Sequence, residues 1–260
     1  MDLGLKENVV VITGGGSGIG QAITRGCLAE EASVVVVGRH TAAVESFAAE
    51  MAGDAHCRFF EAELAEPAQC QRAVAFAVEQ FGQLDALVNN AGANDSIGLG
   101  SGDPQRFMES LRQNLLHYYA MAHYALPLLK AARGTIVNIS SKVALTGQGN
   151  TSAYAAAKGA QLALTREWAA ELAPFGVRVN SVLPAEVFTP LYAAWLGQQK
   201  DGDEARQGIE RRIPLEHRMT RAEEIAAAVV FLLSPTQSAH TTAQQVVVDG
   251  GYTHLDRALT

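Results

Sequence analysis

Short runs of β-branched residues recur along this 260-residue chain, and longer segments with helical periodicity separate them. The runs at residues 9–12 and 34–37 are apolar at every position. Strands that are apolar throughout are typical of a parallel sheet, because helices cover both of its faces. No other feature limits the fold as strongly, and the alternation predicts repeated β-α-β units.

Seven of these runs are predicted to be strands, and the segments between them to be mostly helical. The strands are expected at residues 9–13, 33–37, 56–61, 86–89, 134–140, 178–183 and 245–248. Helices are expected, for example, at residues 20–30, 68–82, 104–132, 152–174 and 221–233. The predicted fold class is therefore α/β, with a doubly wound, Rossmann-type parallel sheet of seven strands and helices on both faces.

One hydrophobic core can serve a chain of this length, so we expect a single domain over residues 1–260. The least regular region, about 186–214, precedes the last predicted helix. An insertion at this place would lie beside the carboxyl ends of the strands. We therefore interpret it as a substrate lid.

The charge and the cysteine content argue against several kinds of partner. A formal net charge of −7 would repel a nucleic-acid backbone. The three cysteines have no CxxC spacing and no histidines at metal-ligand offsets. The first residues lack the features of a signal peptide, and no apolar stretch reaches the roughly 20 residues of a membrane span. We expect no nucleic acid, membrane or metal partner, reduced thiols and a cytoplasmic location.

A glycine-rich loop, TGGGSGIG at residues 13–20, directly follows the first predicted strand and opens a helix. Glycines allow a tight turn and a close backbone approach to a pyrophosphate, whose charge the helix N-terminus favours. In the first β-α unit of such a sheet, this loop predicts dinucleotide binding. The expected contacts come from Gly14, Gly16, Ser17, Gly18, Ile19 and Gly20.

Ser141, Tyr154 and Lys158 form the second group of residues that indicates chemistry. Tyr154 and Lys158 are four residues apart on a predicted helix and share one face, so the ammonium can lie near the phenol. A free tyrosine titrates near about 10, so a base at neutral pH needs strong stabilisation of its anion. Spacing alone is equally compatible with a half-buried helix aromatic and a solvated lysine.

These motifs, in this order and spacing, resemble the short-chain dehydrogenase/reductase family. The similarity extends through NNAG at residues 89–92, YAAAK at 154–158 and VVVDGG at 246–251. By resemblance, Asn114 holds a water in a proton relay and Ser141 positions the substrate oxygen. Tyr154 is then the general acid/base, and Lys158 binds the nicotinamide ribose and lowers the pKa of the tyrosine.

The same resemblance implies further cofactor contacts, with two departures from the family pattern. The implied contacts are Asn90, Ala91, Gly92, Pro184, Val187 and Thr189, together with Tyr154 and Lys158. Ala185 stands where the family commonly has glycine after proline. Glu63 and Leu64 stand where the family commonly has an aspartate that contacts adenine. We keep Glu63 and Leu64 as expected cofactor contacts.

The end of the second strand bears on the choice of cofactor. Gly38, Arg39 and His40 follow that strand, where an NAD enzyme usually has a carboxylate for the ribose hydroxyls. Arg39 can pair with a 2′-phosphate, and His40 can add a donor. We therefore expect NADP, with NAD possible if Arg39 only stacks on adenine.

The loops expected around the nicotinamide combine polar groups with an aromatic ring. The expected substrate contacts are Asn94, Ser141, Gln148, Tyr154, Glu186 and Trp195, with Asp95 and Asn150 close by. Sugars need directional polar partners and an aromatic surface for their C–H face. Segments 94–100, 117–124, 141–154 and 251–259 also resemble bacterial L-fucose dehydrogenases of this family. This predicts oxidation of an aldose, L-fucose above all, at C1 to a lactone.

Several alternatives remain open from the sequence. An alternative to sugar binding is that the polar loop residues only solvate the loop ends, because loops are polar by default. Rival activities are a 3-oxoacyl-carrier-protein reductase and a hydroxysteroid dehydrogenase, and a cofactor-sensing module without chemistry is a third class. The aromatic stretch 115–124 is interpreted as an association surface, because the resembled family pairs this helix in a dimer. We expect a homo-oligomer, a dimer of dimers, and as an alternative for His117 a role in the relay or pocket.

Overall fold

The computed structural model describes residues 2–199 and 201–255. Within them, seven strands form one sheet in the order β3-β2-β1-β4-β5-β6-β7, and every neighbouring pair is parallel. The strands are β1 (Val9–Thr13), β2 (Ser33–Gly38), β3 (Cys57–Glu61), β4 (Ala86–Asn89), β5 (Thr135–Ile139), β6 (Arg178–Pro184) and β7 (Gln245–Val248). The predicted fold class and all seven predicted strands are confirmed.

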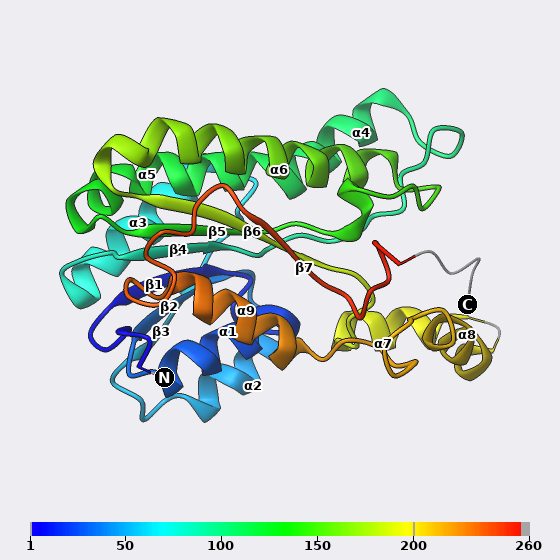
Figure 1. Cartoon of the computed structure of the whole chain (residues 1–260), viewed down its shortest axis with the longest axis horizontal. Coiled ribbons are helices and arrows are strands. Elements are labelled where there is room, and N and C mark those ends of the chain that lie inside the picture. Colours follow the sequence, from blue (N-terminus) through cyan, green and yellow to red (C-terminus); the bar gives the residue numbers. More distant parts are fainter. Residues whose placement is uncertain (1, 200, 256–260) are drawn as a thin grey trace.

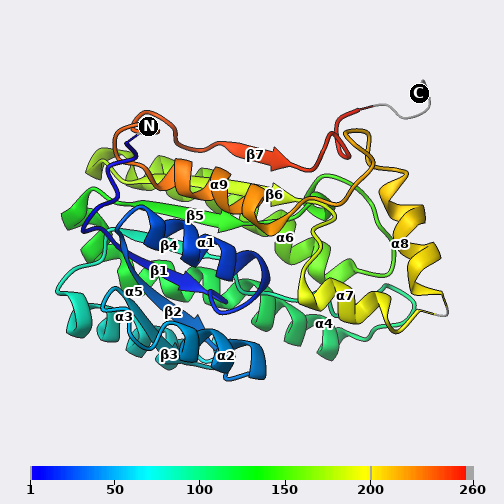
Figure 2. The same cartoon turned by 90° about the horizontal axis from the view of Figure 1, so that it is seen from below.

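Helices cover both faces of this sheet (Figure 1). One face carries α3 (Pro67–Phe81), α5 (His117–Ala132) and α6 (Ser152–Leu172), with α4 (Pro104–Leu111) beside α6. The other face carries α1 (Gly18–Ala29), α2 (Ala42–Glu50) and α9 (Ala222–Leu233). Between β6 and α9 lie α7 (Pro190–Leu196) and α8 (Gly202–Glu210), beyond the carboxyl ends of the strands (Figure 2).

Two hydrophobic cores form because successive strand residues point to opposite faces. Val35 and Val37 of β2 belong to the core under α3, α5 and α6. Val34 and Val36 belong to the core under α1 and α9. The strand order reverses between β1 and β4, which creates a crevice at the carboxyl ends of these two strands.

All three cysteines are part of these cores. Burial raises the pKa of Cys27 to about 12 and the pKa values of Cys57 and Cys70 to about 11. In the described part of the chain, no group of three potential metal-ligating side chains is placed to hold a metal ion. Among the same residues, none of the helices has the length and hydrophobicity that crossing a membrane requires.

The structure also contains helices that the periodicity did not indicate. Helix α2 was not among the expected helices, and the Thr41 side chain caps it by accepting a hydrogen bond from the Val44 amide at 3.3 Å. In the region expected to be irregular, Thr189 caps α7 and Asp201 caps α8 in the same way. These caps make short helices possible where no apolar stripe indicates them.

The long helix expected at residues 104–132 is continuous, but one turn in its middle is π-helical instead of α-helical. A π-helical turn, Arg112–Leu116, separates α4 from α5. Such turns displace one residue from the regular hydrogen-bond pattern and are frequent at functional sites. Asn114 lies in this turn.

Candidate active site

The glycine-rich loop is fixed to the strand beside it. The Thr13 hydroxyl accepts hydrogen bonds from the backbone amides of Asn90 and Ala91, at 2.9 and 3.1 Å. The Asn90 side chain donates to the Thr13 carbonyl at 2.9 Å. Gly14 has a φ of 64°, and a Cβ at Gly20 would lie 2.1 Å from the Gly14 carbonyl oxygen. The first two loops of the crevice therefore form one rigid unit that only these glycines permit.

A cleft of about 760 Å³ opens at the carboxyl ends of the central strands, and it is lined by every residue predicted to bind the cofactor. These are Gly14, Gly16, Ser17, Gly18, Ile19, Gly20, Arg39, His40, Glu63, Leu64, Asn90, Ala91, Gly92, Tyr154, Lys158, Pro184, Val187 and Thr189. Its size lies within the range of cofactor sites. The N-terminus of α1 and the glycine-rich loop face it, so the residues present fit a dinucleotide.

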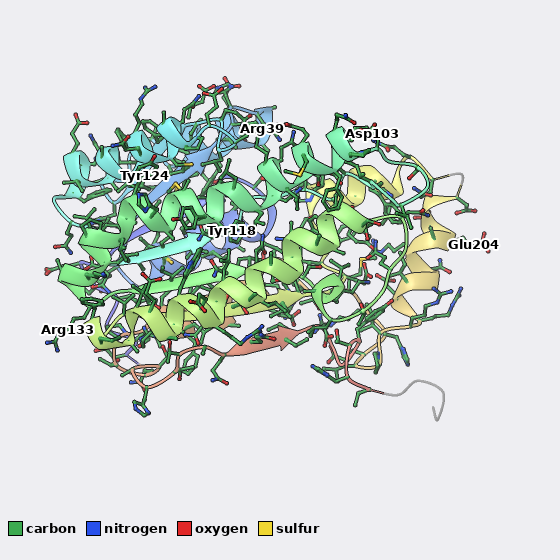
Figure 3. All side chains as sticks on the ribbon, turned by 90° about the horizontal axis from the view of Figure 1, so that it is seen from above. Arg39, Asp103, Tyr118, Tyr124, Arg133 and Glu204 are labelled. Carbon is green, nitrogen blue, oxygen red and sulfur yellow. The ribbon has the colours of Figure 1, made fainter. Side chains whose placement is uncertain are left out.

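One end of the cleft mixes charges of both signs. Arg39 and His40 are exposed after β2, and Figure 3 shows Arg39 at the edge of the molecule. Glu61 lies across the strand pair from Gly38, and Glu45 lies one turn into α2. Both carboxylates line the cleft. Sequence reasoning missed them because it considered only the residues that directly follow β2.

Three of the four expected catalytic side chains, those of Ser141, Tyr154 and Lys158, line the other end of the cleft. Ser141 follows β5, and Tyr154 and Lys158 lie in the first two turns of α6. The Lys158 ammonium is 5.4 Å from the centre of the Tyr154 ring. It donates hydrogen bonds to the Ile139 carbonyl at 2.8 Å and to the Tyr118 hydroxyl at 3.4 Å. Figure 3 places Tyr118 under α5, over the middle of the sheet.

Burial dominates the ionisation of these groups. Burial raises the pKa of Tyr154 to about 12, against a hydrogen bond with Ser141 that lowers it. Burial also lowers the pKa of Lys158 to about 7. Among the causes that act on the pKa of Tyr154, burial is therefore larger than the hydrogen bond from Ser141. A further positive charge beside the phenol is needed to stabilise its anion.

Asn114 connects three elements around this end of the cleft. Its side-chain oxygen accepts a hydrogen bond from the Ala93 amide at 2.9 Å, in the loop after β4. Its side-chain nitrogen donates to the Ser110 carbonyl at 3.1 Å. Its own carbonyl accepts a hydrogen bond from the Gln161 side chain at 2.8 Å, on α6. Gln161 was not among the predicted residues, because nothing in its local pattern distinguishes it from a helix-face glutamine.

The predicted substrate residues are only partly brought together. Asn94 lines the cleft with Ser141 and Tyr154. Burial raises the pKa of Tyr154 most strongly, the hydrogen bond with Ser141 lowers it, and the charge of Asp95 raises it by a smaller amount. One carboxylate oxygen of Asp95 is buried without a partner among the described residues. Gln148 and Asn150 are exposed on the loop before α6 and do not line the cleft.

Glu186 is engaged by two side chains that sequence reasoning missed. It forms an ion pair with Lys142, and only 9% and 12% of the Lys142 and Glu186 side chains are exposed. The Tyr192 hydroxyl donates to its other carboxylate oxygen at 2.6 Å. The Lys142 ammonium also lies 4.3 Å from the centre of the Tyr252 ring. This cluster joins the residue after Ser141 to α7 and to the segment after β7.

Trp195 is half-exposed on α7 and packs edge-on against Tyr192, with ring centres 5.4 Å apart. Tyr192 lines the cleft, whereas Trp195 does not. The last part of the segment that resembles bacterial L-fucose dehydrogenases, residues 256–259, lies outside the described residues. Tyr252, in the first part of that segment, belongs to the cluster around Glu186.

Comparisons with known proteins agree with this geometry. Residues 14–253 match the model of a short-chain dehydrogenase family described as enoyl-(acyl carrier protein) reductase. Mouse L-fucose dehydrogenase is 35% identical over 244 residues, which are 94% of this chain and 87% of that protein. The crystal structure of Cj0485 dehydrogenase superposes with a TM-score of 0.95 at 43% identity and covers 100% of this chain and 99% of its own.

A second solved structure, ligand-free aldohexose dehydrogenase from Thermoplasma acidophilum, superposes with a TM-score of 0.88 at 28% identity. It covers 99% of this chain and 98% of its own. The family model covers residues 14–253, a range that includes the glycines of the glycine-rich loop and the Ser141, Tyr154 and Lys158 positions. The chain belongs to the short-chain dehydrogenase/reductase family and is an oxidoreductase that acts on CH–OH groups.

Proposed function

We propose that this enzyme oxidises a small aldose at its anomeric hydroxyl to a lactone, with L-fucose as its best substrate and NADP as its cofactor. The observation that carries the proposal is the meeting of Ser141, Tyr154 and Lys158 at one end of a cleft that the expected cofactor contacts line. Similarity to the mouse L-fucose dehydrogenase and to the aldohexose dehydrogenase supports the substrate class.

In the proposed mechanism the chain's residues handle the proton. The Ser141 hydroxyl binds the oxygen of the reacting C–OH group, and Tyr154 accepts its proton. The residues that line the cleft would hold a nicotinamide dinucleotide, which in its oxidised form would supply the hydride acceptor and a positive charge. This charge, with Lys158, offsets the burial that raises the pKa of Tyr154 to about 12.

A sugar fits the polar groups beside the tyrosine. Asp95 follows the cleft residue Asn94, and one of its carboxylate oxygens is buried without a partner among the described residues, so a sugar hydroxyl that reached it would satisfy it. Asn94 adds an amide on the same side of the cleft. In the proposed lid, residues 186–214, Tyr192 and Trp195 offer aromatic surface for a C–H face. A steroid would leave the carboxylate unpaired.

The experiment for the substrate is a panel of kcat/KM values. L-Fucose, L-galactose, D-arabinose and L-rhamnose are compared with a hydroxysteroid and a 3-oxoacyl ester. We expect the first three sugars to react and rhamnose not to, because those three share the same hydroxyl pattern. Activity confined to the steroid or the ester would refute the sugar assignment. No turnover of any compound would favour a cofactor-sensing protein.

The cofactor preference rests on Arg39, which can pair with the 2′-phosphate of NADP. Glu45 and Glu61 line the same end of the cleft and favour the free ribose hydroxyls of NAD. The test is Arg39→Ala, titrated with both cofactors by fluorescence. A charge-assisted hydrogen bond is worth about 1.5–3 kcal/mol, so the NADP Kd should rise about 10- to 150-fold with little change for NAD. Equal losses for both cofactors would mean that Arg39 stacks on adenine.

Two further predictions accompany this function. A homo-oligomer, a dimer of dimers, is supported by an apolar groove between α4, α5 and α6, which Met108, Leu115, Tyr119 and Leu164 help to line. Light scattering of the purified enzyme would measure its mass. The expected cytoplasmic location stays a prediction, which fractionation of the source cells would test.

A further inference from the structure

Tyr118 is a buried tyrosine that the mechanism above does not use. It lies in the first turn of α5, its exposed fraction is 0%, and the described residues that line the cleft do not include it. Its hydroxyl donates a hydrogen bond of 2.8 Å to the Ile139 carbonyl at the end of β5. This bond fixes the direction of the hydroxyl proton, so the oxygen can only accept from any further partner.

The further partner is Lys158, whose ammonium lies near two tyrosine rings. It is 5.5 Å from the centre of the Tyr118 ring and 5.4 Å from the centre of the Tyr154 ring. It donates to the Tyr118 hydroxyl at 3.4 Å and to the same Ile139 carbonyl at 2.8 Å. An ammonium has three N–H donors, so a third can face the cleft that Lys158 lines.

Only one of these two tyrosines is placed to act on a substrate. Tyr154 lines the cleft with Ser141, whereas Tyr118 does not. Burial, followed by the proximity of Tyr154, raises the pKa of Tyr118 well above its usual value, against a smaller effect of Gln161 that lowers it. Tyr118 therefore keeps its proton at neutral pH, and its oxygen stays a neutral acceptor for the ammonium.

Lys158 needs such an acceptor because burial acts against its charge and lowers its pKa to about 7. A carboxylate would compensate for burial, but within the described ranges no carboxylate forms an ion pair with Lys158. Two neutral oxygens, those of Tyr118 and Ile139, accept from the ammonium in its place. Hydrogen bonds to a charged group favour the charged form.

The other titratable groups around Lys158 supply no negative charge in the free enzyme at pH 7. His117 on α5 lines the cleft and is neutral, because burial, with the charge of Lys158, lowers its pKa to about 3. Tyr154 on α6 is protonated, since burial raises its pKa to about 12. Asp95, after β4, acts by its charge on Tyr154. The strand β5 contributes the Ile139 carbonyl.

We propose that Tyr118 is a positioning residue, which keeps the Lys158 ammonium charged and holds it beside Tyr154. The hydroxyl and the Ile139 carbonyl fix two of the three N–H groups, so the position of the charge is set before any ligand binds. A positive charge at this position favours the Tyr154 anion that accepts the substrate proton. Tyr118 itself acts only through Lys158. The proposal rests on the proposed roles of Tyr154 and Lys158.

The experiment measures the pKa of Lys158 in the free enzyme. The sequence has five lysines, so ¹³C NMR of enzyme labelled at the lysine ε-carbons can follow each one, and Lys158→Met identifies its signal. Tyr118→Phe removes the hydroxyl but keeps the ring, and the Ile139 carbonyl keeps Lys158 as its donor. A hydrogen bond to a charged group corresponds to a change of about 1–2 in pKa. Because 3.4 Å is long for such a bond, we expect the pKa of Lys158 to fall by about one unit.

The activity of the same variant provides a second measurement. If the pKa of Lys158 falls from about 7 by about one unit, its charged fraction at pH 7 falls from about a half to about a tenth. We therefore expect kcat at pH 7 to fall about 5-fold for L-fucose, or for whichever compound of the panel is active, with little change in KM. Tyr124→Phe, further along α5 (Figure 3), is the matched control and should leave both the pKa of Lys158 and kcat unchanged.

Three results would overturn the proposal. An unchanged pKa of Lys158 in Tyr118→Phe would mean that the tyrosine only fills space, and a raised pKa that its hydroxyl competes with Lys158 for the Ile139 carbonyl. A lowered pKa with an unchanged kcat would mean that the reaction does not use the charge. If Tyr118→Phe does not fold, Tyr118→Leu also lacks the hydroxyl, and the same results in it count against the proposal. The titration needs no substrate, so a wild-type enzyme that turns over no compound of the panel would refute the proposed function alone.

Discussion

The four expected catalytic residues lie on the π-helical turn, after β5 and on α6, which we together call the floor of the cleft. The proposed lid, in contrast, consists of two short helices on the surface. On the floor, Asn114 and Lys158 are almost completely buried, and each is hydrogen-bonded to backbone. In the lid, Leu191 is 66% exposed, and α8 buries none of its side chains. Glu204 on α8 points away from the rest of the molecule (Figure 3). The sheet and the helices packed on it hold the proposed catalytic residues, whereas the substrate choice that we propose belongs to a region with few buried side chains.

The two regions are joined mainly by the cluster of Lys142, Glu186 and Tyr192. Lys142 directly follows Ser141 on the floor, Glu186 begins the lid, and Tyr192 is on α7. A second connection is the backbone pairing of Val187 with Thr220. Because the ion pair is nearly buried, its two ends cannot separate cheaply. The position of Ser141 is therefore coupled to the position of the lid.

The largest expected effect concerns the floor. Tyr154→Phe removes only the ionisable oxygen, and proton transfer by a placed side chain contributes about 10²–10⁴-fold. We expect kcat to fall by that factor while the cofactor Kd stays nearly unchanged. Steady-state kinetics and fluorescence titration measure the two quantities, with the exposed Tyr119→Phe as a control that should behave like wild type. A Tyr154→Phe enzyme that works at nearly the normal rate would remove the basis of the mechanism.

The next effect concerns the connection between floor and lid. Glu186→Gln leaves the Lys142 ammonium buried and unpaired, which costs about 3 kcal/mol or more when a buried pair is broken. Urea unfolding should show this loss of stability, and KM should rise because the lid loses its anchor. The double variant Lys142→Met/Glu186→Gln carries no unpaired charge and should recover most of the stability. If the double variant is as unstable as the single one, the ion pair is not the anchor.

A smaller effect is a loss of folding stability in acid, which originates from the buried His117 directly after the π-helical turn of the floor. The pKa of His117 is about 3 in the folded protein, and an unfolded histidine titrates near about 6.5. Between these values the unfolded chain binds the extra proton, so this stabilisation is complete above pH 6.5 and is lost as the pH falls. By pH 5 the loss is about 2 kcal/mol. Urea unfolding at pH 7.5 and pH 5 should show a smaller decrease for His117→Phe, and equal decreases would contradict the assignment.

The smallest effect belongs to the lid. Trp195→Ala removes a ring that is 45% exposed and that supports Tyr192 from behind. An aromatic pair contributes about 0.5–1.5 kcal/mol, so KM for the sugar should rise about 2- to 10-fold with little change in kcat. Stability should also change little. A large fall in kcat would mean that the lid takes part in the chemistry, and the contrast between the two regions would then be wrong.

The sequence predicts the sheet well because β1 and β2 contain continuous apolar runs, and the other strands are short segments rich in apolar residues that alternate with helical segments. Helix α2 is harder to predict, since Phe47 is its only buried residue and no apolar stripe marks it. The helices of the lid are short and begin at the single caps Thr189 and Asp201. A cap indicates where a helix can begin but not whether one forms.

The candidate site divides in the same way. The glycine-rich loop and the Tyr154–Lys158 pair are local patterns, so their residue types and spacing are sufficient to indicate chemistry. Tyr118 and Gln161 acquire their meaning only when α5, α6 and β5 pack together. Lys142 and Glu186 are 44 positions apart and meet only through the crossover between β5 and β6. No spacing rule within one element reveals a pair of this kind.

The burial of all three cysteines has a practical consequence. The thiolate is the reactive form of cysteine, and at pH 7.5 a thiol with a pKa near 11 or 12 is ionised in fewer than about one molecule in a thousand. The folded enzyme should therefore store well without a reducing agent and stay unlabelled by maleimide dyes. A variant such as Glu204→Cys would carry one reactive thiol on α8. The fluorescence of a maleimide dye attached to this thiol would report movement of the proposed lid in a protein that is otherwise native.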